Sequence, residues 1–177
     1  MSADRDAALS ALLDKQALHE LAMRYSRAID RRDPALLASV YHPDAHDEHG
    51  TFFDGPARDF IANLETTMAV FAVSQHMIGN ASYRLDGDRA EGELYFTAYH
   101  RTLPPDPRHE IVRGRYLDRY ERRGGEWRIA YRKLVWDSYE TTEVRPSDTE
   151  TLAALGEGGA GADDYSYRAL SLLGRGC

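Results

Sequence analysis

The sequence predicts an α+β fold in which a curved antiparallel sheet is covered by helices on one side. Three observations lead to this prediction. Apolar residues near the N-terminus recur at helical spacing, residues from about 70 to 136 alternate between apolar and polar as strands do, and turn residues separate the alternating runs. Helices followed by strands that are joined by hairpins are typical of α+β domains.

Two helices are expected first. Apolar side chains recur every three or four residues between positions 8 and 31, which predicts a long amphipathic helix. Asp33 followed by Pro34 predicts the start of a second, short helix, because aspartate caps helices and proline suits the first helical position. The segment beginning at Tyr41 should end this helix.

One short and four longer strands follow. Residues 45–53 should form the short strand, residues 54–56 a turn, and Pro56 the start of a third helix. An Asp-Gly pair at positions 86 and 87 predicts a tight hairpin. The longer strands are expected at residues 70–83, 90–102, 111–121 and 127–136.

A single domain is expected at residues 8–140, followed by a flexible tail at 141–177. The tail is rich in Thr, Glu, Gly and Ala, and its glycines are close together, as in flexible linkers. Its last part regains apolar residues such as Tyr165 and Leu170, which should dock on this subunit or on a neighbour. Cys177 is the single cysteine and has no internal disulfide partner.

Composition excludes several classes of function. The net charge of -7 argues against nucleic acid as a partner, since nucleic-acid binders usually carry a basic face. No run of 18 apolar residues is present, so no membrane association is expected. The first residues lack the basic and apolar stretches of a signal peptide, which makes a cytoplasmic protein the expectation.

Two histidines on neighbouring strands are the candidate functional residues. If the hairpin forms, His76 and His100 are held at fixed positions on one sheet, and His100 shares a face with Phe96. A lone histidine on an apolar face is more often a satisfied core residue than a catalyst. His46 and His49 are three apart, so on a strand they point to opposite faces and no metal site is expected.

Other chemistries lack their motifs. There is no Gly-x-Ser-x-Gly segment, no phosphate-binding glycine loop and no cysteine before the last residue. Acid-base chemistry without a cofactor therefore remains as the expectation.

Four segments in this order resemble the NTF2-like superfamily, and within it the SnoaL-like group that includes scytalone dehydratase and bile acid 7α-dehydratase. They are RYSRAIDRRD (24–33), YHPDA (41–45), QHMIG (75–79) and YERRGGEW (120–127). The resemblance covers roughly residues 10 to 137. It implies a cone-shaped fold with a curved antiparallel sheet, covered by N-terminal helices, around a hydrophobic pocket.

The resemblance also implies a catalytic site. On an ideal helix Asp30 lies about 120° from the centre of the apolar stripe, so periodicity alone predicts that its side chain is exposed to solvent. The resemblance implies instead that this side chain points inward. It implies that Asp30 pairs with His100, which would take a proton, and that His76 would help a hydroxyl to leave, with Tyr25 as a donor. Expected pocket residues are His49, Phe96, Tyr116 and Trp136, although the last two, like Tyr25, suit ordinary core packing equally well.

The sequence departs from the group at three positions. Ile29 replaces a tyrosine of scytalone dehydratase, and Ala98 and Trp136 stand where bile acid 7α-dehydratase has an aspartate and an arginine. That half of the bile acid machinery is therefore absent, and scytalone dehydratase is the closer chemical model.

The resulting hypothesis is a lyase without cofactor or metal that dehydrates a small, hydrophobic, cyclic hydroxy-carbonyl substrate. An isomerase or a polyketide-type cyclase would use the same residues through an enolate. A non-catalytic binding module, or the small subunit of a ring-hydroxylating dioxygenase with an iron-containing large partner, are the other classes. The resemblance further implies a homo-oligomer, with a trimer favoured over a dimer.

Overall fold

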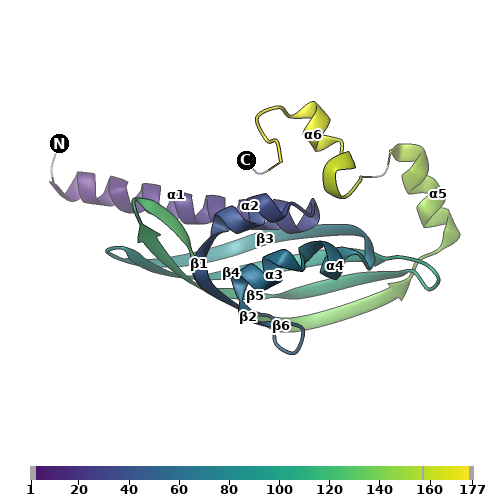
Figure 1. The fold of residues 1–177 in the computed structure, drawn as a ribbon, viewed down its shortest axis with the longest axis horizontal. Coiled ribbons are helices and arrows are strands. Elements are labelled where there is room, and N and C mark those ends of the chain that lie inside the picture. Colours follow the sequence, from purple (N-terminus) through teal and green to yellow (C-terminus); the bar gives the residue numbers. More distant parts are fainter. Residues whose placement is uncertain (1–2, 157, 176–177) are drawn as a thin grey trace.

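The computed structural model describes residues 3–156 and 158–175, so Cys177 lies outside the described residues (Figure 1). Helices cover one face of a curved six-stranded sheet, which confirms the predicted α+β fold. The helices are α1 (Ala3–Asp30), α2 (Pro34–Val40), α3 (Ala57–Ala62), α4 (Leu64–Met68), α5 (Pro146–Leu155) and α6 (Ser166–Ala169), with a 3-10 turn η1 (Gly161–Asp163). The strands are β1 (Tyr41–Glu48), β2 (Asp54–Pro56), β3 (Phe71–Asp86), β4 (Arg89–Thr102), β5 (Arg108–Arg123) and β6 (Glu126–Glu143).

The long helix α1 follows the predicted periodicity, but only its second half is packed. Leu18 and Leu21 are fully buried, and this half of the helix lies against β3. Leu9, Leu12 and Leu13 belong to the same apolar stripe and are exposed. The first turns of α1 extend beyond the strands (Figure 1). The packed half brings the last residue of α1 to the face of the sheet.

Helix α2 begins as the sequence predicts. The Asp33 carboxylate accepts a hydrogen bond from the backbone N–H of Leu36 at 3.0 Å, and Pro34 occupies the first turn. Leu36, Leu37 and Val40 are all buried beneath it. The apolar face of this short helix thereby forms part of the core.

The sheet differs from the prediction in three places. The short strand expected at residues 45–53 is β1 at Tyr41–Glu48. The strand order is β2-β1-β6-β5-β4-β3, and β1 runs parallel to β6, so the sheet is antiparallel except for this pair. Residues 54–56 form strand β2, paired with β1, and the prediction of a turn there is wrong. The turn instead lies just before β2, and the third helix is divided into α3 and α4, with Pro56 preceding α3.

The predicted hairpin holds the two histidines in register. Asp86 pairs with Arg89 across a two-residue turn in which Gly87 has a φ of +57°, a conformation that favours glycine. Further along the same ladder, His100 lies opposite Ser74 and His76 lies opposite Ala98. Both imidazoles therefore project from the face of the sheet that carries the buried residues of β4.

The C-terminal residues return to the first helix. After β6, which is longer than expected, α5 leads to a segment that lies on the side of α1 and α2 away from the sheet (Figure 1). Arg31 forms an ion pair with Asp164 at 2.6 Å, and Arg27 donates a hydrogen bond to the carbonyl of Leu173 at 2.8 Å. The end of the tail thus docks on its own subunit, one of the two alternatives that the sequence left open. The flexibility of the tail stays a prediction.

None of the helices in the described ranges combines the length and the apolar character that a membrane crossing requires.

A glycine in β5 allows two strands to approach closely. A Cβ on Gly114 would collide with the carbonyl oxygen of Val135 and lie 3.0 Å from the ring of Phe96, beside a register shift between β5 and β6. We expect Gly114→Ala to lower the free energy of unfolding by about 1–3 kcal/mol, the usual cost of overpacking. Urea denaturation measures this loss. Gly79→Ala is the control, since its Cβ would lie 3.7 Å from the nearest atom, and equal losses in both variants would contradict the expectation.

Candidate active site

A cavity of about 260 Å³ lies between the sheet and the helices. Its walls come from α1, α3, α4 and the four long strands, and apolar and aromatic side chains form most of its surface. Of the residues predicted for the site, all except Asp30 line the cavity: Tyr25, His49, His76, Phe96, His100, Tyr116 and Trp136. Asp30 contacts His76 directly, so the predicted set is brought to one place.

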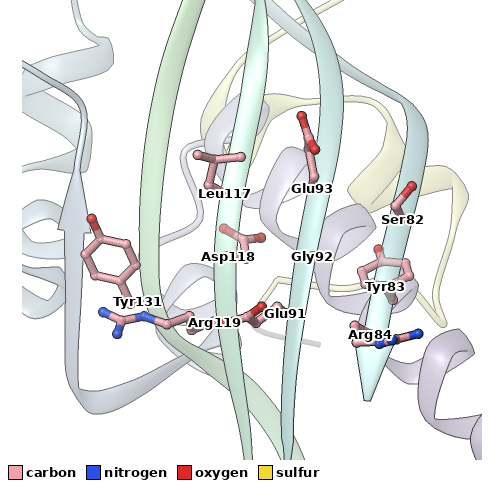
Figure 2. A pocket seen from close by; sticks show the side chains of 10 residues that line it. All are labelled: Ser82, Tyr83, Arg84, Glu91, Gly92, Glu93, Leu117, Asp118, Arg119 and Tyr131. Carbon is pink, nitrogen blue, oxygen red and sulfur yellow. The ribbon is translucent and has the colours of Figure 1, made fainter. Parts of the chain in front are cut away.

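A second hollow of about 420 Å³ lies over β3, β4, β5 and β6 (Figure 2). Charged residues such as Arg84, Glu91 and Arg119 surround it, and the helices lie behind the strands in this view. It contains no histidine. The cavity that holds the histidines is therefore the candidate active site.

Asp30 pairs with His76. One carboxylate oxygen of Asp30 lies 2.7 Å from Nδ1 of His76 and accepts a hydrogen bond from the Ser74 hydroxyl at 2.9 Å. The other oxygen accepts the backbone N–H of His76 at 2.8 Å. The predicted pairing of Asp30 with His100 is wrong, because the end of α1 meets β3, the strand that carries Ser74 and His76, before it reaches β4.

These contacts keep the carboxylate of Asp30 ionised. Burial by itself raises the pKa of Asp30, but the hydrogen bonds from His76 and Ser74 outweigh burial, and the net pKa is lowered. A carboxylate at this distance requires a hydrogen on Nδ1 of His76. In the neutral ring, Nε2 then carries the free lone pair, and the side chain lines the cavity.

His100 lies beside this pair in an apolar setting. Its ring stacks on Phe71 with centroids 4.3 Å apart and meets the edge of His76 at 5.4 Å. Its Nδ1 is buried and has no hydrogen-bond partner among the described residues. Burial, with a smaller effect from His76, lowers the pKa of His100 to about 4, so this imidazole is neutral at neutral pH.

The low pKa of His100 makes stability depend on pH. In the unfolded chain this histidine has a pKa near 6.5. The contribution of neutral His100 to the free energy of unfolding is therefore fully present above about pH 6.5 and is lost as the pH falls toward 4. At pH 5 this effect should cost about 2 kcal/mol. Urea denaturation at pH 7 and pH 5 should therefore show a larger loss in the wild type than in His100→Phe, and equal losses would contradict the assignment.

A buried ion pair supports one wall of the cavity. Arg132 is fully buried and forms two hydrogen bonds with Asp118, at 2.6 and 2.8 Å. Its guanidinium lies between the rings of Tyr25 and Tyr116, 4.1 Å from each centroid. Burial raises the pKa of Tyr25 more than Arg132 lowers it, so the hydroxyl of Tyr25 stays protonated and able to donate.

Neither Arg132 nor Asp118 was predicted from the sequence as part of the site. The signal for them is their position: both occupy inward-facing places on their strands, directly opposite each other in the ladder of β5 and β6. A charged residue at an inward place of an alternating strand indicates a buried ionic partner. In a region with many arginines this signal is easily read as a solvated face.

His49 forms another part of the cavity wall. Its ring meets the edge of Phe60 at 4.9 Å, and Nε2 lies 3.3 Å from a carboxylate oxygen of Asp47 without the alignment of a hydrogen bond. Burial lowers the pKa of His49 and keeps the ring neutral. His46 is exposed on β1 and contacts Asp54 at 2.7 Å, whereas His49 is buried just after β1 ends at Glu48, so the two histidines do not share the one strand that the sequence predicted.

Comparison with known proteins finds a matching family and several relatives. A family model described as a SnoaL-like domain matches residues 10–133. Uncharacterized proteins of Mycobacterium tuberculosis and Mycobacterium bovis are 34% identical to this chain over 83 residues, which are 46% of this chain and 56% of theirs. The chain thus spans about half the length of the curated relatives it matches.

Two solved structures with the same fold are named as a dehydratase and a dehydrochlorinase. A candidate scytalone dehydratase from Novosphingobium aromaticivorans has a TM-score of 0.70 at 23% identity, over 78% of this chain and 93% of that one. A hexachlorocyclohexane dehydrochlorinase, LinA-type3 from Novosphingobium barchaimii, has a TM-score of 0.71 at 16% identity, over 78% and 99%. At these identities the likeness shows the fold alone.

Proposed function

This chain belongs to the SnoaL-like domain family within the NTF2-like superfamily, and we propose that it is a cofactor-independent lyase that removes water from a small cyclic hydroxy ketone. The observation that supports this most is the buried Asp30–His76 pair at the wall of an apolar cavity. The names of the two structural neighbours, a dehydratase and a dehydrochlorinase, both denote eliminations.

In the first step, His76 acts as the base. Its Nε2 takes a proton from the carbon next to the substrate carbonyl, and the electron pair of that C–H bond moves toward the carbonyl as an enolate. Asp30 stabilises the imidazolium that forms, because its carboxylate already accepts the Nδ1 hydrogen. Tyr25, with its hydroxyl protonated, lines the cavity and serves as a donor to the enolate oxygen.

In the second step, the same histidine completes the loss of water. The enolate electrons form the carbon–carbon double bond, the C–O bond breaks, and the departing hydroxide takes the proton from the His76 imidazolium. The neutral ring of His100 donates a hydrogen bond to the leaving oxygen but has no spare proton to give at neutral pH. The roles of His76 and His100 are thus exchanged relative to the sequence-based assignment.

Isomerisation through the same enolate is the second candidate function. One proton carrier is sufficient for it, since His76 would return the proton to a different carbon, and the neutral state of His100 favours such single-base chemistry.

A pure binding module explains the site less well. An ionised carboxylate beneath an apolar cavity costs stability, which binding alone does not require.

Water loss from 3-hydroxy-1-tetralone tests the proposal. This bicyclic β-hydroxy ketone gives 1-naphthol on dehydration, and the product is followed by its fluorescence. Exchange of the α-protons of 1-tetralone in D₂O, followed by NMR, reports proton abstraction without a leaving group. Proton exchange without dehydration of any hydroxy ketone would favour the isomerase. If neither reaction is faster than in buffer, the binding module is favoured.

The expected assembly follows from the resemblance, and the expected location follows from the sequence. A homo-oligomer, with a trimer favoured, and a cytoplasmic location therefore stay predictions, and sedimentation equilibrium of the purified protein tests the first of them.

A further inference from the structure

Glu110 places a carboxylate in the wall of the cavity. It lies on β5 directly opposite His100 on β4, so the Cβ atoms of the two residues are about 4.5–5.5 Å apart on one face of the sheet. One carboxylate oxygen accepts a hydrogen bond from the hydroxyl of Tyr139 on β6 at 2.9 Å. The other oxygen has no partner among the described residues and is free to accept from a ligand.

The cavity offers little to an anionic ligand. Among the described residues that line it, none is a lysine or an arginine. Arg132 lies behind the rings of Tyr25 and Tyr116, and its charge is matched by Asp118. A carboxylate ligand would therefore meet the negative charge of Glu110 without a cationic partner, and two like charges repel each other.

Size and aromatic lining favour a compact ring compound. The volume of about 260 Å³ lies just below the range of about 300–1,000 Å³ that is typical of ligand pockets. Phe52, Trp136 and Tyr139 line the cavity and are at least half exposed, so they surround its mouth. Planar rings stack on such side chains.

We propose that Glu110 determines substrate specificity by accepting a hydrogen bond from a hydroxyl group at the mouth end of an uncharged ring substrate, and by excluding carboxylates. The inference rests on the proposed function, for which it defines the substrate class. The reacting carbon lies at His76 and the recognised hydroxyl at Glu110. Glu110 positions the substrate and takes no part in proton transfer.

Binding of two matched probes tests this role. Calorimetry at pH 7 with 2-naphthol, which is neutral, and 2-naphthoate, which is anionic, gives an affinity ratio for each variant. The wild type is expected to prefer 2-naphthol by tenfold or more, because hydrogen bonds to an ionised acceptor are about twice as strong as neutral ones. Glu110→Gln keeps the shape, removes the charge and should lower this ratio by about tenfold.

Glu91→Gln is the matched control. Glu91 is on β4 and borders the second hollow, so its charge lies outside the cavity (Figure 2). This variant should keep the wild-type ratio. Tyr139→Phe removes the hydroxyl that holds Glu110 but keeps the carboxylate, so it should change the ratio less than Glu110→Gln does.

Three results would overturn the proposal: equal affinity of the wild type for both probes, no binding of either probe, or the same ratio in Glu110→Gln as in Glu91→Gln. Because the ratio is a binding measurement, it does not depend on turnover. Failure of the dehydration assay with an intact ratio would contradict the proposed reaction and leave the role of Glu110 in place.

Discussion

Replacing His76 by glutamine is expected to lower the rate of 1-naphthol formation by about 10²- to 10⁴-fold, the usual contribution of a general base. Glutamine retains polar atoms near Asp30 but has no lone pair that takes a proton at neutral pH. Substrate affinity should change little, because the apolar lining remains. The loss should therefore fall on kcat rather than on KM.

His46→Gln is the control for this change. His46 is a histidine on β1 that is exposed and paired with Asp54 outside the cavity, so its replacement should leave the rate unchanged. Circular dichroism verifies that both variants fold. If the His76→Gln enzyme retains more than a tenth of the wild-type rate, His76 is not the base.

Removing Asp118 is expected to cost about 3–5 kcal/mol of unfolding free energy. Asp118→Ala removes both hydrogen bonds that the fully buried guanidinium of Arg132 donates to Asp118, and a buried charge that loses its ionic partner is strongly destabilising. Replacing both residues, as in Asp118→Leu with Arg132→Met, should recover part of this loss, since apolar side chains need no ionic partner. The buried Asp47, which lies opposite Arg132 on β1, keeps its hydrogen bond from Tyr41.

Urea denaturation at pH 7 measures both effects. Asp88→Ala is a suitable control, because it removes an exposed partner of Arg122 and should cost far less. A single Asp118→Ala variant as stable as Asp88→Ala would contradict the view that this ion pair supports the cavity wall. The double variant should also alter the cavity, because Tyr25 and Tyr116 lose the cation between their rings.

Most of the fold was predictable because its signals are local. The Asp33–Pro34 start of α2 and the Asp-Gly turn between β3 and β4 depend on residues that are neighbours in the chain. The parallel pairing of β1 with β6 joins segments about 85 residues apart, and no local pattern encodes it. The exposed leucines of α1 had no such signal either, since periodicity shows a face but not what covers it.

The members of the site were predictable, whereas their pairing was not. His76 and His100 lie on adjacent strands two register positions apart, and Asp30 ends a helix whose position over the sheet is set by packing. The packing of α1 against β3 decides which imidazole the carboxylate meets. Composition and spacing contain no information about that packing, so the resemblance supplied the residues and the structure supplied their partners.

Nitrogen NMR of the imidazoles tests the Asp30–His76 pair most directly, with ¹⁵N-histidine spectra of the wild type and Asp30→Asn recorded between pH 4 and pH 8. We expect the hydrogen of neutral His76 on Nδ1, loss of this preference in Asp30→Asn, and a pKa of about 4 for His100. A hydrogen on Nε2 of wild-type His76 would contradict the base assignment. So would a titration of His100 near 6.5 that responds to Asp30→Asn while His76 does not.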